Sequence, residues 1–391
     1  MTAAPATAGT ARPATGAARA AAGAAAVTVA SVLPVFLVGG VSVQMAHDLR
    51  FSPAGLGLAV AAYYAVSAAT AVPAGGVVAR LGPIVTGRFA VTLAAAVMLA
   101  IGGLAHGYPT FVGLLALGAV TNAFGQLSAN LLIARALPAG RQGIGFAVKQ
   151  SALPAATLLA GAAVPAIALT AGWRWAFVLA GLLALGALPL MPQVAPGEAT
   201  VRARGRRDLR LLVLAAGAGL ATAATNCLGA FLVASTVRLG VSPGAAGLTL
   251  TLGSLLCITA RLGGGWWADR FRGDLLVAVT GLLVAGAAGV ALLAVGSPAA
   301  LAAGVGLAFG VGWSWPGLFN LSVVRRYPRS PAEATGVTSA GVYVGGCAGP
   351  LGFGVLAAHA GFGVAWTATA AVMLGGAACM LLGCRLLNHS T

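Results

Sequence analysis

Apolar residues fill nearly the whole chain in long stretches, and short polar breaks separate one stretch from the next. Each stretch has about the 20 residues that an α-helix needs to cross the ~30 Å hydrocarbon core of a bilayer. Charged residues, prolines and loop signals place the stretches near residues 27–47, 53–78, 85–105, 109–134, 142–169, 173–191, 211–235, 243–267, 275–295, 299–324, 332–358 and 364–384. The pattern predicts an all-α integral membrane protein with twelve transmembrane helices.

The predicted helices form two groups of six. We expect an N-terminal six-helix bundle over residues 25–191 and a C-terminal one over 211–385, joined by a basic linker, 192–210. Residues 1–24 are rich in Ala, Thr, Pro and Gly and too poor in large apolar groups to order themselves, so a disordered tail is expected there. The apolar stretch that follows is longer than that of a signal peptide, and a short tail, 386–391, ends the chain.

Composition agrees with a membrane protein. Of the 391 residues, 59% are hydrophobic and 7% are charged, and the mean hydropathy is +0.97, whereas a soluble globular protein has about 25% charged residues. The net charge of +16 does not indicate a nucleic-acid partner, because the arginines lie in short gaps between apolar stretches rather than along one face of a folded domain. The five cysteines lie inside apolar stretches without metal-site spacing, so we expect reduced cysteines and no metal.

The basic residues predict the orientation in the membrane. Basic residues concentrate in the loops on the cytoplasmic side of membrane proteins. With the N-terminus inside, only Arg50, Arg174 and Arg238 fall outside, and the central linker places Arg202, Arg204, Arg206, Arg207 and Arg210 inside. We therefore expect a multi-pass protein of the plasma (cytoplasmic) membrane with both termini cytoplasmic.

An internal repeat relates the two bundles. The segments "SPAGLGL" (52–58) and "SPGAAGL" (242–248) open the second and eighth predicted helices, and each Ser-Pro pair is suited to start a helix. Further residues match at the same offset: Gly57 with Gly247, Gly75 with Gly265, Arg80 with Arg270, and Asn130 with Asn320. The repeat predicts parallel copies of six helices, an architecture in which transporters bind substrate between the halves.

Two loop segments carry a resemblance to a known family. The segment "GWWADRFRG" (265–273) is similar to the loop signature G-x-L-A-D-R-x-G-R of the major facilitator superfamily, and "GGVVARLGP" (75–83) is a weaker copy in which Ala79 replaces the acid. The segment "GWRW" (172–175) also resembles the family. The resemblance covers essentially the whole chain. It implies a secondary transporter that works by alternating access, without a cofactor.

The resemblance also implies a cytoplasmic gate. In this family the loops after the second and eighth helices hold the halves together, which implies a gate of Gly75, Arg80, Gly265, Asp269, Arg270, Arg325 and Glu333. Asp269 is expected to face the start of the fifth helix and Arg325 or Arg326, or else only to cap its loop. Glu333 pairs with Arg80 or serves only in a capping box with Ser330.

Lys149 and Arg261 are the only lysine or arginine residues that lie inside predicted helices and away from the helix ends. Lys149 lies about six residues, or roughly 9 Å, into its helix, where a charge normally faces the bundle interior or water. Either Lys149 extends to the membrane interface, or it faces a cavity and receives an anion. In several organic-anion carriers of the family an arginine at the place of Arg261 contacts the substrate, although a structural use is also common.

Uncharged polar residues suggest the rest of a cavity. In this family helices 1, 4, 7 and 10 line the cavity, and the polar residues fall on them, although helix–helix hydrogen bonding is an alternative. The remaining candidates for substrate binding are Asn122, Gln126 and Asn130 at helical spacing, Trp313 and Asn320, Gln44, Asn226 and Tyr343.

All six carboxylates fall at helix ends or in loops, which argues against a membrane-embedded enzyme and against a proton relay through a buried acid. Two internal cations without an intramembrane acid favour an anionic substrate. The sequence therefore predicts a monomeric secondary transporter of a small organic or inorganic anion, with a proton or another ion as a possible coupling partner. Efflux of a neutral or amphipathic compound is the alternative. The Gly-Pro signature of the family's drug–proton antiporters is missing, because Pro154 follows Leu153.

Overall fold

The computed structural model describes residues 14–136, 142–191, 208–268, 270–328 and 330–388, and these ranges contain helices and short connections but no strand. The first half comprises α1 (Ala14–Gly40), α2 (Ser42–Leu49), α3 (Pro53–Leu104), α4 (Tyr108–Ala136), α5 (Gln142–Ala163), the π-helical turn η2 (Val164–Ala168), α6 (Trp173–Gly186) and the short turn η3 (Leu188–Leu190). The second half comprises α7 (Leu209–Arg238), α8 (Pro243–Ala268), α9 (Leu275–Leu293), α10 (Pro298–Val305), the turns η4 (Gly306–Val311) and η5 (Gly312–Ser314), α11 (Trp315–Arg326), α12 (Pro331–His359) and α13 (Phe362–Asn388).

These helices account for the twelve predicted spans. Ten helical segments in the described ranges are long and apolar enough to cross a membrane, and α6 is a shorter apolar helix. The 52-residue α3 holds two spans that meet at Gly82, where φ is 80° and ψ is 163°. Its glycine permits this left-handed kink, which an L side chain would resist. The tenth predicted span is α10 through α11, and it is interrupted by the turns η4 and η5.

The predicted helix starts at the two repeat segments are confirmed. The Ser52 hydroxyl accepts a hydrogen bond from the Gly55 amide at 3.4 Å, and Ser242 accepts one from the Ala245 amide at 3.4 Å. Pro53 and Pro243 are the first residues of α3 and α8. Proline is tolerated there because the first helical N–H has no partner within the helix.

The start of the first helix differs from the prediction. We expected a disordered tail through residue 24, but α1 begins at Ala14. Most residues of this segment are alanines, which have the highest helix propensity, so the segment continues the first span even though it lacks large apolar side chains. The first span also ends earlier than predicted, because the chain breaks at Val41 and continues as the short α2.

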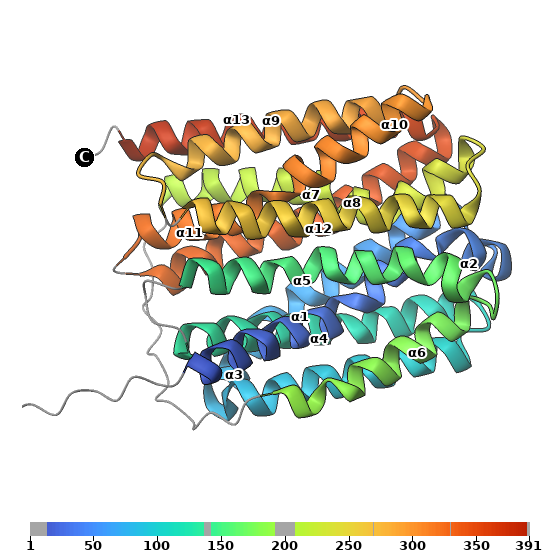
Figure 1. Cartoon of the computed structure of the whole chain (residues 1–391), viewed down its shortest axis with the longest axis horizontal. Helices are drawn as coiled ribbons and strands as arrows, with labels where there is room; N and C mark the ends of the chain where they lie inside the picture. Colours follow the sequence, from blue (N-terminus) through green and yellow to red (C-terminus); the bar gives the residue numbers. More distant parts are fainter. Residues whose placement is uncertain (1–13, 137–141, 192–207, 269, 329, 389–391) are drawn as a thin grey trace, which may run out of the picture.

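The helices lie side by side with their ends at two faces of the molecule (Figure 1). We call the face with Ala14 and Asn388 the terminal face, and the face with Ser52 and Gly172 the opposite face. In Figure 1 the terminal face lies to the left and the opposite face, with α2, to the right. The two halves meet mainly where α5 packs on α8 and α3 packs on α12.

The halves are in close contact near the opposite face. A Cβ added to Gly161 of α5 would lie 2.6 Å from the carbonyl oxygen of Gly247 in α8, and one added to Gly354 of α12 would lie 2.5 Å from that of Pro53. Closer to the terminal face, no atom lies within 4 Å of a Cβ added to Gly264 of α8 or Gly336 of α12. The halves are therefore in close contact at the opposite face, and α8 and α12 each have open space beside a glycine nearer the terminal face.

Candidate functional site

Lys149 of α5 lies inside the protein. The residue is 4% exposed, and its ammonium group donates a hydrogen bond to Oε1 of Gln126 on α4. The side chain therefore does not extend to the membrane interface, the arrangement that we considered as one alternative. An amide oxygen compensates only part of the cost of burying an ammonium ion, because no formal charge opposes it.

Arg261 of α8 is the second buried cation, at 3% exposed. Its Nε and Nη2 donate to the carbonyl oxygen of Trp313 at 3.1 and 2.6 Å, and its Nη1 donates to the carbonyl oxygen of Gln150 in α5. These bonds use three of the five N–H donors of a guanidinium group. The guanidinium carbon also lies 5.8 Å from the centre of the Trp313 ring. Arg261 thus connects the second half of the chain to the first.

The two cations lie close along the same part of α5, because Arg261 donates to the carbonyl oxygen of Gln150, the residue that follows Lys149. Among the described carboxylates, Asp48 lies in the short α2 near the opposite face, and Asp208 and Asp274 cap the starts of α7 and α9 near the terminal face. None of the described carboxylates lies within a membrane-spanning segment. The site therefore has a positive electrostatic potential, which would stabilise a bound anion.

A cavity of about 250 Å³ lies beside Arg261. Its walls include Arg261, the side of α5 at Gln150, and Ser314 at the break in the tenth span. The volume is slightly below the roughly 300–1,000 Å³ that is typical of ligand pockets, so it suits a small molecule. We expected both cations to face one cavity, but Lys149 is not in the wall of this one, because its side chain turns toward α4.

The predicted polar stripe on α4 serves partly to join helices. Asn122 is buried and donates a hydrogen bond to the Ser67 hydroxyl of α3 at 3.2 Å, while its Oδ1 has no partner. Gln126 is the acceptor for Lys149, and Asn130 is exposed. The stripe is therefore not one continuous cavity wall. Asn122 instead makes a hydrogen bond between two helices, which is the alternative that we left open.

The other predicted polar residues come from several helices. Trp313 is buried in η5 and packs edge-on against Phe36 of α1, with ring centres 6.0 Å apart, so the halves also meet there. Gln44 lies in α2 rather than in the first long helix, and its Oε1 is buried without a partner. Three further candidates lie on the second half, namely the buried Asn226 of α7 and the half-buried Asn320 of α11 and Tyr343 of α12.

The predicted gate can be described only in part. Arg80 is exposed, and no atom lies within 4 Å of a Cβ added to Gly75. Gly265 lines the cavity beside Arg261. Asp269 and the side chain of Glu333 lie outside the described residues. Ser330 does occupy the first position before α12, but its side chain makes no capping hydrogen bond.

The two described gate arginines of the second half contact backbone carbonyls. Arg270 donates to the carbonyl oxygen of Trp266 at 3.0 Å and lies over its ring at 4.1 Å, and Arg325 donates to the carbonyl oxygen of Ala268 at 3.5 Å. All four residues belong to the second half. These contacts therefore do not join the two halves.

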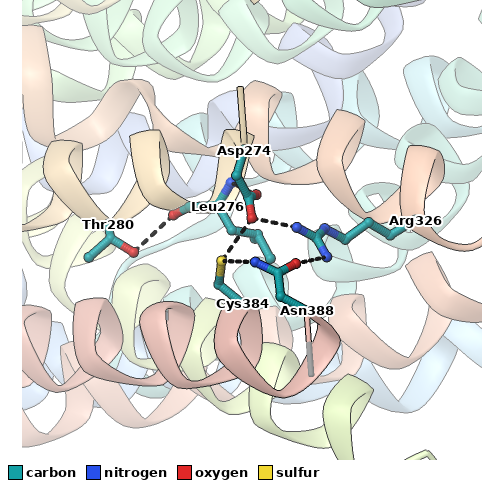
Figure 2. Close-up of polar contacts among 6 residues, drawn as sticks. All are labelled: Asp274, Leu276, Thr280, Arg326, Cys384 and Asn388. Atoms are coloured by element: carbon teal, nitrogen blue, oxygen red, sulfur yellow. Dashed lines mark hydrogen bonds and ion pairs between the residues drawn. The ribbon is translucent and has the colours of Figure 1, made fainter. Parts of the chain in front are cut away.

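A polar cluster that the sequence did not predict lies at the terminal face (Figure 2). Asp274 Oδ2 accepts hydrogen bonds from Arg326 Nη2 at 2.5 Å and from the Cys384 thiol at 2.8 Å, and Arg326 Nη1 donates to Asn388 Oδ1 at 3.1 Å. Burial alone would raise the pKa of Asp274, but the hydrogen bonds from Cys384, the Leu276 amide and Arg326 together lower it. This clamp connects the start of α9 with the ends of α11 and α13.

Two further carboxylates also join helices within one half. The Tyr327 hydroxyl donates to Asp208 at 3.0 Å, and burial together with this bond raises the pKa of Tyr327 to about 12. At the opposite face, Asp48 accepts from Trp173 Nε1 at 2.8 Å and from Arg174 at 3.3 Å. The Trp173 hydrogen bond lowers the pKa of Asp48 against the effect of burial. The described carboxylates are thus engaged at helix ends, away from Lys149 and Arg261.

Comparisons with known proteins place this architecture among membrane transporters. The sequence model of the Major Facilitator Superfamily matches residues 21–215. The chain belongs to the major facilitator superfamily, a family of membrane transporters. No curated protein sequence matches the chain significantly.

Solved structures show the same fold over nearly the whole chain. A bacterial homologue of the human lysosomal transporter Spinster is 16% identical, with a TM-score of 0.71 in an inward-facing occupied conformation, covering 93% of this chain and 96% of its own. In its unoccupied inward-facing conformation the TM-score is 0.73, with 96% and 98% covered. The human organic anion transporter MFSD10 (TETRAN) is 17% identical, with a TM-score of 0.68 and 94% and 100% covered.

Proposed function

We propose that this protein is a secondary transporter that moves a small organic or inorganic anion by alternating access. The observation that carries the proposal is the buried guanidinium of Arg261 in the wall of a small cavity, with Lys149 near enough to add a second positive charge. Buried charges in transmembrane helices normally mark a substrate or ion pathway, because burying them without such a use is costly. The carboxylates that the structure describes lie at helix ends instead.

In this proposal Arg261 contacts the anion directly. Lys149, the residue before Gln150 of the cavity wall, strengthens the positive field. Ser314 lines the same cavity as Arg261, and the half-buried Gln126 lies beside Lys149. Both side chains carry hydrogen-bond donors. The human organic anion transporter MFSD10 has the same fold, which supports an anionic substrate for this protein. A protonated substrate would carry its own proton and would need no carboxylate in the protein.

The orientation and the gate belong to the same proposal. The basic linker 192–210 leads into α7, which starts at Leu209 near the terminal face. Because basic residues favour the cytoplasmic side, this supports a cytoplasmic terminal face in a plasma-membrane protein with both termini inside. The conformation would then be open to the cytoplasm. Closure would bring together the gate segments around Gly75 and Gly265 with Asp269 and Glu333, and the protein would work as a monomer.

Efflux of a neutral or amphipathic compound is the second candidate. It is favoured by the hydrogen bonds of Arg261 to two backbone carbonyls, because a guanidinium satisfied in this way has a structural use without any substrate. The two candidates differ in what the cavity accepts.

Counterflow into proteoliposomes tests the proposal. Vesicles loaded with a small carboxylate or inorganic anion should take up the same labelled anion from outside. Vesicles loaded with a neutral compound should not take up that labelled neutral compound. Arg261→Met should abolish uptake, whereas Arg385→Met, which removes an exposed arginine far from the cavity, should leave it near the wild-type rate. Counterflow of neutral compounds alone would support the second candidate and contradict the first.

A further inference from the structure

The carbonyl oxygen of Gln150 lacks the hydrogen-bond donor that a regular α-helix would supply. In an α-helix this carbonyl would accept from the N–H four residues further on, but that residue is Pro154, which has no N–H. A buried backbone carbonyl without a donor is costly inside a membrane, because water cannot replace the missing bond. Pro154 therefore creates a strong acceptor in the wall of α5.

The donor for this acceptor comes from the other half of the protein. Arg261 of α8 donates its Nη1 to the Gln150 carbonyl, while Nε and Nη2 donate to the Trp313 carbonyl at the break of the tenth span. One guanidinium thus satisfies a carbonyl in each half. Separating the halves at this level would leave both the Gln150 carbonyl and a buried charge without their partners.

This bond lies between a close contact of the two halves and an open stretch of α8. On the side toward the opposite face, α5 and α8 are in close contact at Gly161 and Gly247. On the side toward the terminal face, α8 is open at Gly264, three residues beyond Arg261. Arg261 and Gln150 also both line the cavity, so a molecule in the cavity reaches the bond directly.

We propose that Arg261 is a positioning residue that couples substrate to conformation: it latches α8 onto the carbonyl that Pro154 leaves free in α5, and an anionic substrate group releases this latch by taking over the guanidinium. The second step rests on the proposed function, and the first does not. A carboxylate or other anion is a stronger acceptor for a guanidinium than a neutral carbonyl, because the hydrogen bonds are charge-assisted. The empty protein is therefore held in the conformation described here, and the loaded protein is free to leave it.

Pro154→Ala tests the latch without any substrate. The new N–H gives the Gln150 carbonyl a partner within α5, so that breaking the bond to Arg261 no longer leaves that carbonyl without a donor. Pro73→Ala is the matched control, since it also removes a proline from inside a helix, but the carbonyl that it restores belongs to the exposed Ala69 of α3. Arg261→Lys is a second variant that keeps the charge and loses the planar fork that reaches two carbonyls.

The measurement is the distance between spin labels, attached without using cysteine, at the exposed Arg88 of the first half and Arg272 of the second. The comparison is made in detergent and without substrate. Pro154→Ala and Arg261→Lys should each lower the population of the conformation described here, relative to all others, by on the order of tenfold, as expected for one hydrogen bond to a charged group. Pro73→Ala should match the wild type. An unchanged distribution in a folded Pro154→Ala protein overturns the latch.

A second arm separates the latch from the proposed function. Acetate, phosphate and citrate are added to the wild type, and binding is followed independently by thermal shift. An anion that binds should shift the wild-type distribution in the same direction as Pro154→Ala does. An anion that binds and leaves the distribution unchanged overturns the release step, although anion transport would stand. Failure of every anion to bind, together with a shifted Pro154→Ala distribution, overturns the release step and the anionic substrate but leaves the latch.

Discussion

The ammonium group of Lys149 donates a hydrogen bond to Oε1 of Gln126, which joins α5 to α4 inside the first half. This contact assigns the one lysine of the chain to the protein interior. Gln126 orients the charge but does not neutralise it. The pair therefore has testable consequences for stability that differ from those of a surface lysine.

Lys149→Met should leave the free energy of unfolding within about 1 kcal/mol of the wild type, because removing a buried charge offsets the acceptor that Gln126 loses. Gln126→Leu should be clearly more destabilising, since it leaves the ammonium without its acceptor. The double variant should recover most of that loss. Thermal unfolding in detergent of the three variants measures the coupling, and strictly additive effects would contradict the contact.

Asp274→Asn should lower the free energy of unfolding by about 1 kcal/mol at pH 7, a value that allows for the partial exposure of the clamp. The pKa of Asp274 is lowered in the folded protein, so its contribution is present above the ordinary aspartate pKa of 3.8 and is lost as the pH falls through the lower folded value. The difference between wild type and variant should therefore shrink below about pH 4. A difference that stays constant from pH 7 to pH 3 would show that the carboxylate charge is not involved.

Trp173→Phe should lower stability by about 1 kcal/mol, because it removes the indole donor that binds Asp48 while keeping an aromatic ring in place. Trp175, two residues further on, is 54% exposed. Trp175→Phe is therefore the matched control and should have little effect. Equal melting temperatures for the two variants would contradict a stabilising role for the Asp48 hydrogen bond.

Gly354→Ala should disfavour the conformation that is closed at the opposite face, because the new methyl group would lie 2.5 Å from the Pro53 carbonyl oxygen. Gly336→Ala places the same change in the same helix where no atom lies within 4 Å. The distance between labels at the exposed His106 and His359, near the opposite face, should increase in the first variant only. An unchanged distance in Gly354→Ala would mean that the helices there adjust without separating the halves.

Hydrophobic patterning predicted most of the fold. The spacing of apolar stretches and the Ser-Pro starts gave the spans and the two halves, because a bilayer demands long apolar helices whatever their packing. The helical start at Ala14 was missed, since alanine forms helices without adding much to an apolar pattern. The breaks at Val41 and in the tenth span depend on packing between helices, which one sequence does not reveal.

The candidate site was predicted less completely. Lys149 and Arg261 stood out because charges inside apolar stretches are rare. Their partners could not be predicted, because Gln126 and the Gln150 carbonyl come from helices that only the packing brings near. The clamp at Asp274 depends likewise on the meeting of three helix ends. Pro154, four residues after Gln150, was the available signal for the free carbonyl.

The central claim is that the buried cations receive an anion, and a thermal-shift titration of the purified protein tests it most directly. Wild type and Lys149→Met are each titrated with small organic and inorganic anions, with organic cations and with neutral compounds. A ligand at about 100 times its dissociation constant adds roughly 2.7 kcal/mol of stability, which is readily detected. We predict that only anions stabilise the wild type and that Lys149→Met weakens or abolishes the effect. Stabilisation by neutral compounds alone, or an equal anion response in the variant, would contradict the claim.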